Sequence, residues 1–451
     1  MRRGIVIWAL IGVTLLGASC GPCQLPPPAA AITGDNSGGT IAIYEIWQPS
    51  GSYGQVYVQK IGDQGDFLWG EDGIPIGSGC RADDRCESYA VSDGSGGGIV
   101  IWMERLPQPE GEPRSSDFQT HVARADSEGY IKWQRDIPGV DQAIPDGSGG
   151  VIIAYTDPYG NVSVLRIDSD GNRPWGGEAV SLNTGQRWLL SVASDDLGGI
   201  IVVGWDLEGG FGPVYVQRVD SGGNALWQTG GVQVCTGPAE GAQVVSDGPG
   251  GAIVAYMRDI PCDDGRIGYC DWDIYAQRID AEGNVLWGPD GVPICAGPSS
   301  FPNGPGIVTD GAGGAIISFF FLDGYEAFRA RRIDADGHEL WEQEAELWGG
   351  MLVSDGAGGV ISVWYGEEGT NARAQRVDAM GRELWGPGGT ELPLREGQWW
   401  LAAPDGRGGV LISWAAAEFK GCDLSEVSYY VQRIDAEGNL PWGNEGILVN
   451  P

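Results

Sequence analysis

Few residues in this chain could carry acid–base or nucleophilic chemistry in a recognised arrangement. Only two histidines occur among the 451 residues, His121 and His338. A Ser-His-Asp, Cys-His or histidine-metal arrangement is therefore not expected, and no GxSxG, phosphate-binding loop or HExxH motif is present. The 61 acidic residues could include a carboxylate pair for glycoside hydrolysis, but the sequence gives no separations between them. The pattern favours a protein that is not an enzyme, with a polysaccharide-active glycosidase or lyase as the alternative.

Two short acidic segments have the composition of calcium loops. They are "DSDG" (168–171) and "DADG" (334–337). Corresponding segments elsewhere read "DAEG", "DSGG" or "DAMG", so hairpin turns explain all of them better. We predict no metal and no other cofactor.

Most of the chain consists of one repeated unit. The phrase "YAQRIDAEGNVLWG" (275–288) returns almost unchanged as "YYVQRIDAEGNLPWG" (429–443), and a second phrase such as "VSDGPGGAIVAY" (245–256) recurs with it. Aligned on the Asp of the second phrase, there are eight copies at spacings of 45 to 63 residues. The repeated acids are Asp35, Asp93, Asp146, Asp195, Asp247, Asp310, Asp355 and Asp405.

In each copy, a basic residue and then a tryptophan follow the Asp. The pairs are Lys60/Trp69, Arg124/Trp133, Arg166/Trp175, Arg218/Trp227, Arg278/Trp287, Arg332/Trp341, Arg376/Trp385 and Arg433/Trp442. We interpret these residues as structural: the Asp and the basic residue pair once per repeat, and the Trp packs between repeats.

The repeat has the pattern of four antiparallel strands. In the fifth copy, "AQVVS" and "AIVAY" flank a Gly-rich hairpin turn, "IYAQRID" alternates as a third strand, and "VLW" begins a fourth after the turn "AEGN". The segment "GPDGVPICAG" (288–297) is interpreted as a link to the next unit rather than a fifth strand. Four strands in about 40–50 residues is the size of a propeller blade. We predict an all-β fold, an eight-bladed β-propeller, with seven blades or a stacked β-solenoid as alternatives.

These motifs resemble the secreted bacterial repeat propellers whose blades read SDGxGGxIVxW…YxQRID…GxxLWG. The resemblance covers residues 31–450 and implies the fold rather than an activity. The chain is only loosely similar to the Asp-box propellers such as sialidases, because Trp102 lies nine residues beyond Asp93 instead of within the same short turn.

Successive strands of a four-stranded meander run in opposite directions, so their turns lie alternately on two opposite faces of the ring. The first and third turns open on one face and are short and uniform, whereas the second connections and the links between blades open on the other and vary. Variable loops on a rigid scaffold usually bind partners. Trp47 and five further tryptophans fall outside the repeated positions and on this variable face. The five are candidates for binding a glycan or protein partner, with plugging of blade ends as the alternative: Trp188, Trp272, Trp348, Trp399 and Trp400.

The formal net charge is −34. Such a charge repels nucleic acid and anionic lipid headgroups, so neither is an expected partner. Its spread over all repeats is typical of a solubilising surface.

The N-terminus resembles a bacterial export signal. Arg2 and Arg3 precede an apolar stretch (4–18), and "LLGASC" (15–20) resembles a lipobox that would make Cys20 a lipidated residue. We predict a signal peptide over 1–19, a lipid-anchored, Pro-rich tether over 20–31 and a single propeller over 32–450. The protein is then expected at a bacterial cell envelope, on the outer membrane or the cell surface, and touches the membrane only through that lipid. Cleavage by an ordinary signal peptidase and secretion is the alternative.

Export permits disulfides among the nine cysteines. Cys80 with Cys86 and Cys262 with Cys270 are the predicted local pairs. Cys235 and Cys295 occupy the same repeat position and are interpreted as buried apolar residues. Cys23 and Cys422 would come together in a closed ring.

Overall fold

The computed structural model describes sixteen stretches of the chain. They are 30–46, 54–80, 86–106, 118–157, 159–177, 179–182, 187–206, 212–261, 269–295, 304–322, 326–341, 345–346, 351–364, 371–394, 400–420 and 423–449. The predicted signal peptide, with Cys20, and nearly all of the predicted tether lie outside these residues, as do Cys23 and Cys422.

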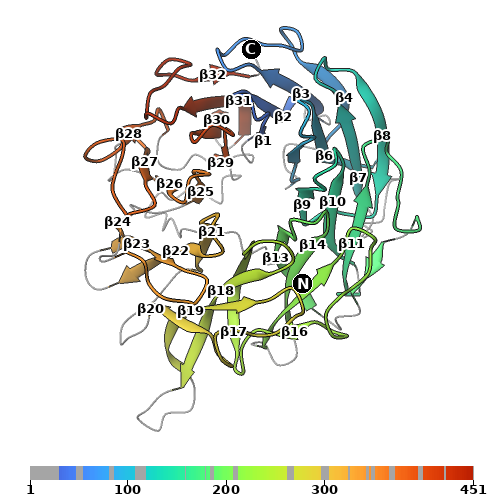
Figure 1. The fold of residues 1–451 in the computed structure, drawn as a ribbon. Coiled ribbons are helices and arrows are strands. Elements are labelled where there is room, and N and C mark those ends of the chain that lie inside the picture. Colours follow the sequence, from blue (N-terminus) through green and yellow to red (C-terminus); the bar gives the residue numbers. More distant parts are fainter. Residues whose placement is uncertain are drawn as a thin grey trace.

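The described residues form eight sheets, and each sheet is an antiparallel meander of four consecutive strands. The sheets stand around a central axis as the blades of a propeller (Figure 1). The predicted all-β fold and the eight blades are confirmed. No helix in the described part of the chain is long and apolar enough to cross a membrane.

The strands of the first four blades follow one another along the chain. They are β1 (Ala31–Gly34), β2 (Thr40–Ile46), β3 (Gln55–Ile61) and β4 (Ile74–Ser78); β5 (Tyr89–Ser92), β6 (Gly98–Arg105), β7 (Phe118–Ala125) and β8 (Ile131–Ile137); β9 (Gln142–Pro145), β10 (Val151–Thr156), β11 (Val162–Ile167) and β12 (Val180–Ser181); and β13 (Arg187–Ser194), β14 (Ile200–Asp206), β15 (Val214–Val219) and β16 (Val232–Gln233).

The last four blades repeat this order. They are β17 (Ala239–Ser246), β18 (Ala252–Pro261), β19 (Tyr269–Ile279) and β20 (Val292–Cys295); β21 (Gly306–Thr309), β22 (Ala315–Leu322), β23 (Glu326–Ile333) and β24 (Ala345–Glu346); β25 (Met351–Ser354), β26 (Val360–Trp364), β27 (Arg373–Val377) and β28 (Thr390–Glu391); and β29 (Trp400–Pro404), β30 (Val410–Lys420), β31 (Asp423–Ile434) and β32 (Ile447–Leu448).

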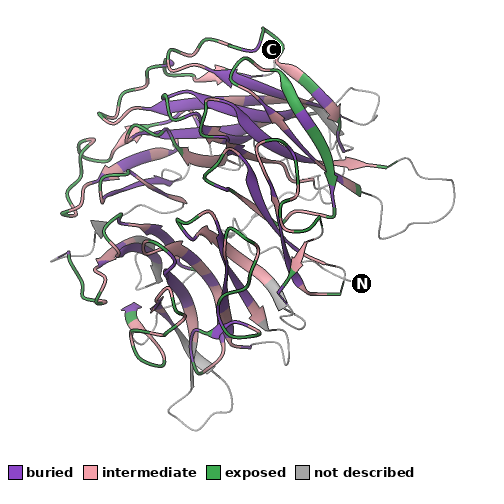
Figure 2. Ribbon diagram, turned by 45° about the vertical axis from the view of Figure 1, so that its right-hand side comes forward, coloured by how far each residue is buried: buried purple, intermediate pink, exposed green. Residues whose placement is uncertain are grey.

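The first strand of each blade is innermost, and these strands contact one another around the ring. The second strands are apolar on both faces because a neighbouring blade covers each face, as Ile41, Ala42 and Ile43 in β2 illustrate, all of them fully buried. Each hydrophobic cluster spans neighbouring blades; one runs from Ile201 in β14 to Ile279 in β19. The blades in Figure 2 are therefore buried along their middle strands and exposed at their turns.

The start of the fourth strand differs from the sequence prediction. In blade 5, "VLW" makes only an isolated bridge, Ile279 to Val285, and the fourth strand is β20, inside the segment that was predicted to be a link. The reason is the buried side chain of Gln277. Its Oε1 accepts the N–H of Trp287 at 3.0 Å and its Nε2 donates to the carbonyl of Gly288 at 2.7 Å. This amide takes the place of backbone pairing until β20 begins. Each blade still has four strands, so the assignment of the two faces holds.

The ring closes without exchange of a strand between the first and last blades. Both sheets consist of consecutive strands, and side chains of blade 8 make the closure. Ser413 donates its hydroxyl to the carbonyl of Ala30, and the Trp442 indole N–H donates to the carbonyl of Asp63 at 3.0 Å. Ala30, Tyr44, Tyr429 and Val449 share one hydrophobic cluster across this boundary.

Candidate functional site

The face formed by the first and third turns, which we call the uniform face, is built from one repeated contact. In blade 2, Oδ1 of Asp93 accepts the backbone N–H groups of Ser95 and Gly97, both at 2.8 Å. Its Oδ2 accepts Nε and Nη2 of Arg124 at 3.1 and 2.9 Å. Burial opposes ionisation of this carboxyl, but the hydrogen bonds from Ser95 and Arg124 outweigh it and lower its pKa.

The same ion pair occurs in all eight blades. The other seven are Lys60–Asp35, Arg166–Asp146, Arg218–Asp195, Arg278–Asp247, Arg332–Asp310, Arg376–Asp355 and Arg433–Asp405. The predicted Asp–basic pairing is thus confirmed in every blade. We call each pair, with the turn that it holds, a clasp.

Each clasp also reaches the next blade. Nη1 of Arg124 and the indole N–H of Trp133 both donate to the carbonyl of Ser169, at 2.8 and 2.9 Å, in the third turn of blade 3. In six blades, the arginine Nη1 and the indole N–H both donate to one carbonyl oxygen of the next blade. The indole ring lies against a third-turn glycine of the next blade. Gly171 has φ of 81°, and a Cβ there would come within 2.7 Å of Trp133. The predicted packing of the repeated tryptophans between blades is confirmed.

The turns with calcium-like composition belong to this uniform face. Oδ1 of Asp334 accepts the N–H groups of Asp336 and His338, both at 2.9 Å, and Asp168 holds its own turn in the same way. Asp334, Asp336 and His338 lie close enough together to hold a cation, with Asp334 half-buried and the other two exposed. The hydrogen bonding is that of a hairpin turn, as the sequence predicts.

The structure describes little of the predicted tryptophan sites. Trp47, Trp348 and Trp399 lie outside the described residues. For Trp188 in β13 and Trp272 in β19, the structure describes the backbone and not the side chain. Trp400 opens β29 opposite Trp414, and its half-buried side chain packs against the core of blades 7 and 8. Trp400 thus contacts the core as the alternative of plugging a blade end expects, and its role as a binding residue stays a prediction.

On the variable face, a polar cluster forms where the innermost strands of blades 2 and 3 begin. We call Glu87, Tyr89 and Asp141 the channel-mouth cluster. The Tyr89 hydroxyl lies 2.7 Å from Oε2 of Glu87 and 2.8 Å from the carbonyl oxygen of Asp141. Oδ2 of Asp141 accepts the backbone N–H of Thr156 at 2.7 Å. Tyr89 thus joins the Glu87 carboxyl to the backbone of Asp141 where β5 and β9 begin, and the Asp141 carboxyl is tied to the end of β10.

The electrostatics of the channel-mouth cluster are unlike those of the Asp93 clasp. Partial desolvation raises the pKa of Asp141, the hydrogen bonds from Thr156 lower it, and the charge of Glu87 raises it further. Burial also raises the pKa of the Tyr89 phenol, and Glu87 adds to that effect. Because the pKa of Asp141 is raised, its charge opposes folding, whereas the lowered pKa of Asp93 means that the Asp93 charge supports folding.

The channel-mouth cluster is not among the site residues predicted from the sequence, although the sequence holds a signal for it. Tyr89 stands four residues before the repeated Asp93, and the same position holds Gln142 in blade 3, Ser191 in blade 4 and Gln243 in blade 5. Gln142 bridges to blade 4 through the carbonyl of Leu190 and the N–H of Val192. Ser191 accepts the N–H of Val244 in blade 5. Polar residues at an innermost-strand position thus mark the channel rim.

His121 lies on the opposite edge of blade 2. Its Nδ1 is 2.8 Å from Oδ1 of Asp136, its Nε2 is 2.9 Å from Oε2 of Glu104, and its ring packs on Trp102. The neighbours of this histidine are carboxylates on adjoining strands and an indole. This contact ties β6, β7 and β8 together at the rim.

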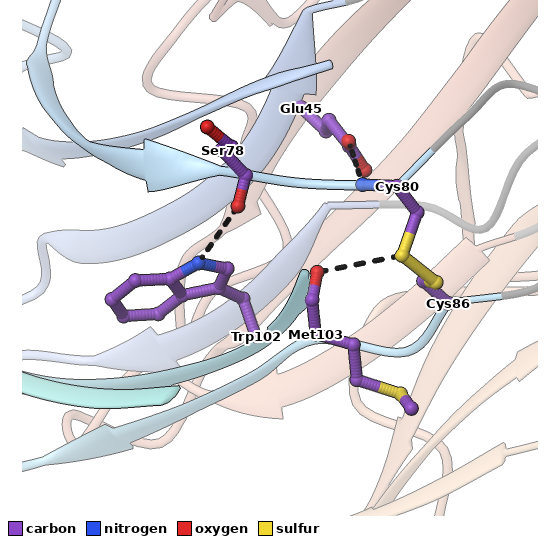
Figure 3. Close-up of a disulfide and its surroundings, with 6 residues drawn as sticks. All are labelled: Glu45, Ser78, Cys80, Cys86, Trp102 and Met103. Carbon is purple, nitrogen blue, oxygen red and sulfur yellow. Dashed lines mark hydrogen bonds between the residues drawn. A yellow bond between two sulfur atoms is a disulfide. The ribbon is translucent and has the colours of Figure 1, made fainter. Parts of the chain in front are cut away.

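Cys80 and Cys86 are joined by a disulfide in the link between blades 1 and 2 (Figure 3). Oε1 of Glu45 accepts the backbone N–H of Cys80 at 2.6 Å, and Sγ of Cys80 lies 3.4 Å from the carbonyl of Met103. Cys235 and Cys295 are buried, and neither is part of a disulfide within the described residues, in agreement with their interpretation as apolar residues. Of the predicted pair Cys262–Cys270, Cys262 lies outside the described residues and the Cys270 side chain is not described.

No protein-family model matches the chain, and no curated protein matches it. Several solved structures are similar to it over most of their length. A PL25 ulvan lyase has 12% identity over 93% of this chain and 94% of the lyase, with a TM-score of 0.45. The β-propeller domain of the Trilobed protease of Pyrococcus furiosus, described as having an open velcro topology, has 9% identity over 79% and 94%, also at 0.45. The uncharacterised protein lmo1340 of Listeria monocytogenes has 10% identity over 77% and 90%, at 0.39. These similarities concern the fold alone.

Proposed function

We propose that this protein is a non-enzymatic binding module that holds a glycan or protein partner on its variable face, with the channel-mouth cluster as part of the contact. The supporting observation is the contrast between the two faces. Clasps hold the first turns of the uniform face in all eight blades, whereas on the other face Glu87, Tyr89 and Asp141 gather acidic and phenolic groups, and burial and the charge of Glu87 raise the pKa of Asp141.

The chemistry of the cluster favours a partner that offers hydroxyl or amine donors. A carboxylate is an acceptor, and the phenol can both donate and accept. The net charge of −34 repels polyanions, so a neutral or basic partner fits better than an acidic one. In this proposal, lipid on Cys20 anchors the protein at the bacterial envelope.

Calorimetric titration of the soluble protein from residue 24 onward against neutral and basic polysaccharides and envelope protein extracts tests this proposal. Asp141→Asn and Tyr89→Phe are expected to weaken a detected interaction about tenfold or more, since each removes a hydrogen-bonding group from the contact. Tyr130→Phe is the matched control, because Tyr130 is 70% exposed on the third turn of blade 2. Equal affinity in all three variants, or no binding to any member of the panel, would contradict the proposal.

A polysaccharide-active enzyme is the second candidate, favoured by one observation. Such an enzyme needs a pair of acidic groups near each other, and the charge of Glu87 acts on the Asp141 carboxyl, with Tyr89 between Glu87 and the Asp141 backbone. Release of new chain ends from a polysaccharide by the wild-type protein, and its loss in Asp141→Asn, would favour the enzyme over the binding module. Binding without chain cleavage would favour the module.

A further inference from the structure

One aromatic position is present in seven of the eight blades and missing from blade 4. It lies near the end of the second strand, nine residues beyond the repeated Asp, and its side chain is at most 9% exposed. The seven residues are Tyr44, Trp102, Tyr155, Tyr256, Phe319, Trp364 and Trp414. In blade 4 this position is Gly204. The adjacent Trp205 does not replace the ring, because neighbouring residues of a strand face opposite sides of the sheet.

The repeated ring fills a space against the preceding blade. Tyr256 of blade 5 shares a hydrophobic cluster with Val214 and Val216 of blade 4. In blade 2, the indole N–H of Trp102 donates to the carbonyl of Ser78 in blade 1 at 3.2 Å (Figure 3). On its own sheet, the ring meets the residue opposite it on the third strand. The ring centroids are 5.8 Å apart for Tyr44–Tyr57, 6.4 Å for Tyr256–Tyr275 and 5.3 Å for Trp414–Tyr430.

Where blade 4 lacks the ring, a small cavity lies between blades 3 and 4. Val162 and Leu182 of blade 3 line it, together with Val202, Gly204 and Tyr215 of blade 4. We call it the blade-4 notch. Its volume is about 10 Å³, room for one water molecule. The three aliphatic side chains are at most 4% exposed, whereas Tyr215 is half-buried. Tyr215 is therefore the side chain that can turn outward and widen the notch for a larger group.

The other blades also show where a hydroxyl on such a ring would bond. Tyr44 and Tyr256 donate their hydroxyls to the carbonyls of Asp72 and Asp290, at 3.1 and 2.6 Å. Each carbonyl belongs to the residue before a glycine that precedes the fourth strand. In blade 4 that residue is Gly230, which lines the notch. A carbonyl oxygen has two lone pairs, so Gly230 can accept a hydroxyl in addition to another donor.

We infer that the blade-4 notch binds a phenolic ring supplied from outside the chain, either a tyrosine side chain of a partner or a free phenol. The ring takes the place of the missing aromatic residue. It packs against Val162 and Leu182, Tyr215 stacks on it as Tyr275 stacks on Tyr256, and its hydroxyl donates to the carbonyl of Gly230. The notch shares no residue with the channel-mouth cluster, so this inference does not depend on the proposed function.

Isothermal titration calorimetry of the protein from residue 24 onward with p-cresol, which is the tyrosine side chain as a free molecule, tests this inference. We expect one equivalent to bind with a dissociation constant of about 1 mM or lower. The compound 4-methylcyclohexanol has a similar size and is not flat, so it should bind about tenfold more weakly or less. N-acetyltyrosinamide distinguishes the two sources. Binding of this compound and p-cresol indicates a tyrosine side chain of a partner, and binding of p-cresol alone indicates a free phenol.

Two variants locate the binding in the notch. Gly204→Tyr supplies the ring from the chain itself, so it should abolish p-cresol binding and raise the melting temperature. Tyr256→Gly opens the same notch in blade 5, opposite Tyr275. It should bind a second equivalent of p-cresol, which should restore part of the thermal stability that the substitution removes. No binding by the wild-type protein, equal binding of p-cresol and 4-methylcyclohexanol, or unchanged binding in Gly204→Tyr would each overturn the inference.

Discussion

Among the residues of the eight clasps, Lys60 is the one cation that is not arginine. Its Nζ lies 3.5 Å from Oδ2 of Asp35 and donates to the carbonyl of Gly96 at 2.6 Å. Arg218 instead offers both Nε and Nη2 to Asp195, each at 3.0 Å. The guanidinium thus places two N–H groups on Oδ2 of Asp195, whereas the ammonium of Lys60 makes a single longer contact with Asp35.

Arg218→Lys should therefore lower the free energy of unfolding by about 1–2 kcal/mol, and Arg218→Ala by about 3–5 kcal/mol, because the second change leaves a buried carboxylate unpaired. The reciprocal change Lys60→Arg should raise it. Chemical denaturation measures all three. Equal stabilities of Arg218→Lys and Arg218→Ala would show that the cation contributes little to the clasp.

The raised pKa of Asp141 gives a pH dependence of opposite sign to that of Asp93, whose pKa is lowered. A carboxyl with a raised folded-state pKa contributes its stability below its unfolded value, and loses that contribution as the pH rises through the folded value. Asp141→Asn should thus raise the melting temperature slightly at pH 7 and leave it unchanged near pH 3. Thermal unfolding across this range checks the sign. A lower melting temperature at pH 7 would mean that the charge is stabilising.

At the scale of the strand, the sequence contains enough information to predict the blades and not enough to place their outer edges. The first three strands follow from Gly-rich turns and β-branched runs such as Ala252–Pro261, which are local signals. The fourth strand depends on Gln277, whose side chain bonds to residues ten and eleven positions later. Nothing in a local pattern shows that an amide replaces backbone pairing there.

The candidate site could be predicted less well, for a physical reason. Glu87 and Asp141 are far apart in sequence and meet because neighbouring innermost strands begin at the same rim. The predicted aromatic positions depended on the loops between strands, and Trp400 shows the difficulty: it sits at the boundary between a link and β29 and packs into the core. Separation of the two faces was predictable since it requires only the parity of the strands.

For the molecule as a whole, the ring is closed by side chains rather than by a shared strand. Ala30 and Val449 lie in one hydrophobic cluster, so the two ends of the propeller meet. A circular permutant that joins these ends with a short Gly-Ser linker and opens between Leu394 and Trp400 should fold, because each blade keeps its four consecutive strands. Circular dichroism and thermal unfolding should match the wild-type protein closely. Failure to fold would mean that the chain must assemble from its natural first blade.

The repeated indoles also contribute to the intrinsic fluorescence of the protein. All eight are buried or half-buried, and each donates its N–H to a backbone carbonyl of the following blade. Their fluorescence should be blue-shifted and shielded from a quencher such as acrylamide, and it should report the contacts between blades. Opening of any one boundary between blades would shift part of that emission to the red, so a single optical signal follows the integrity of the entire ring.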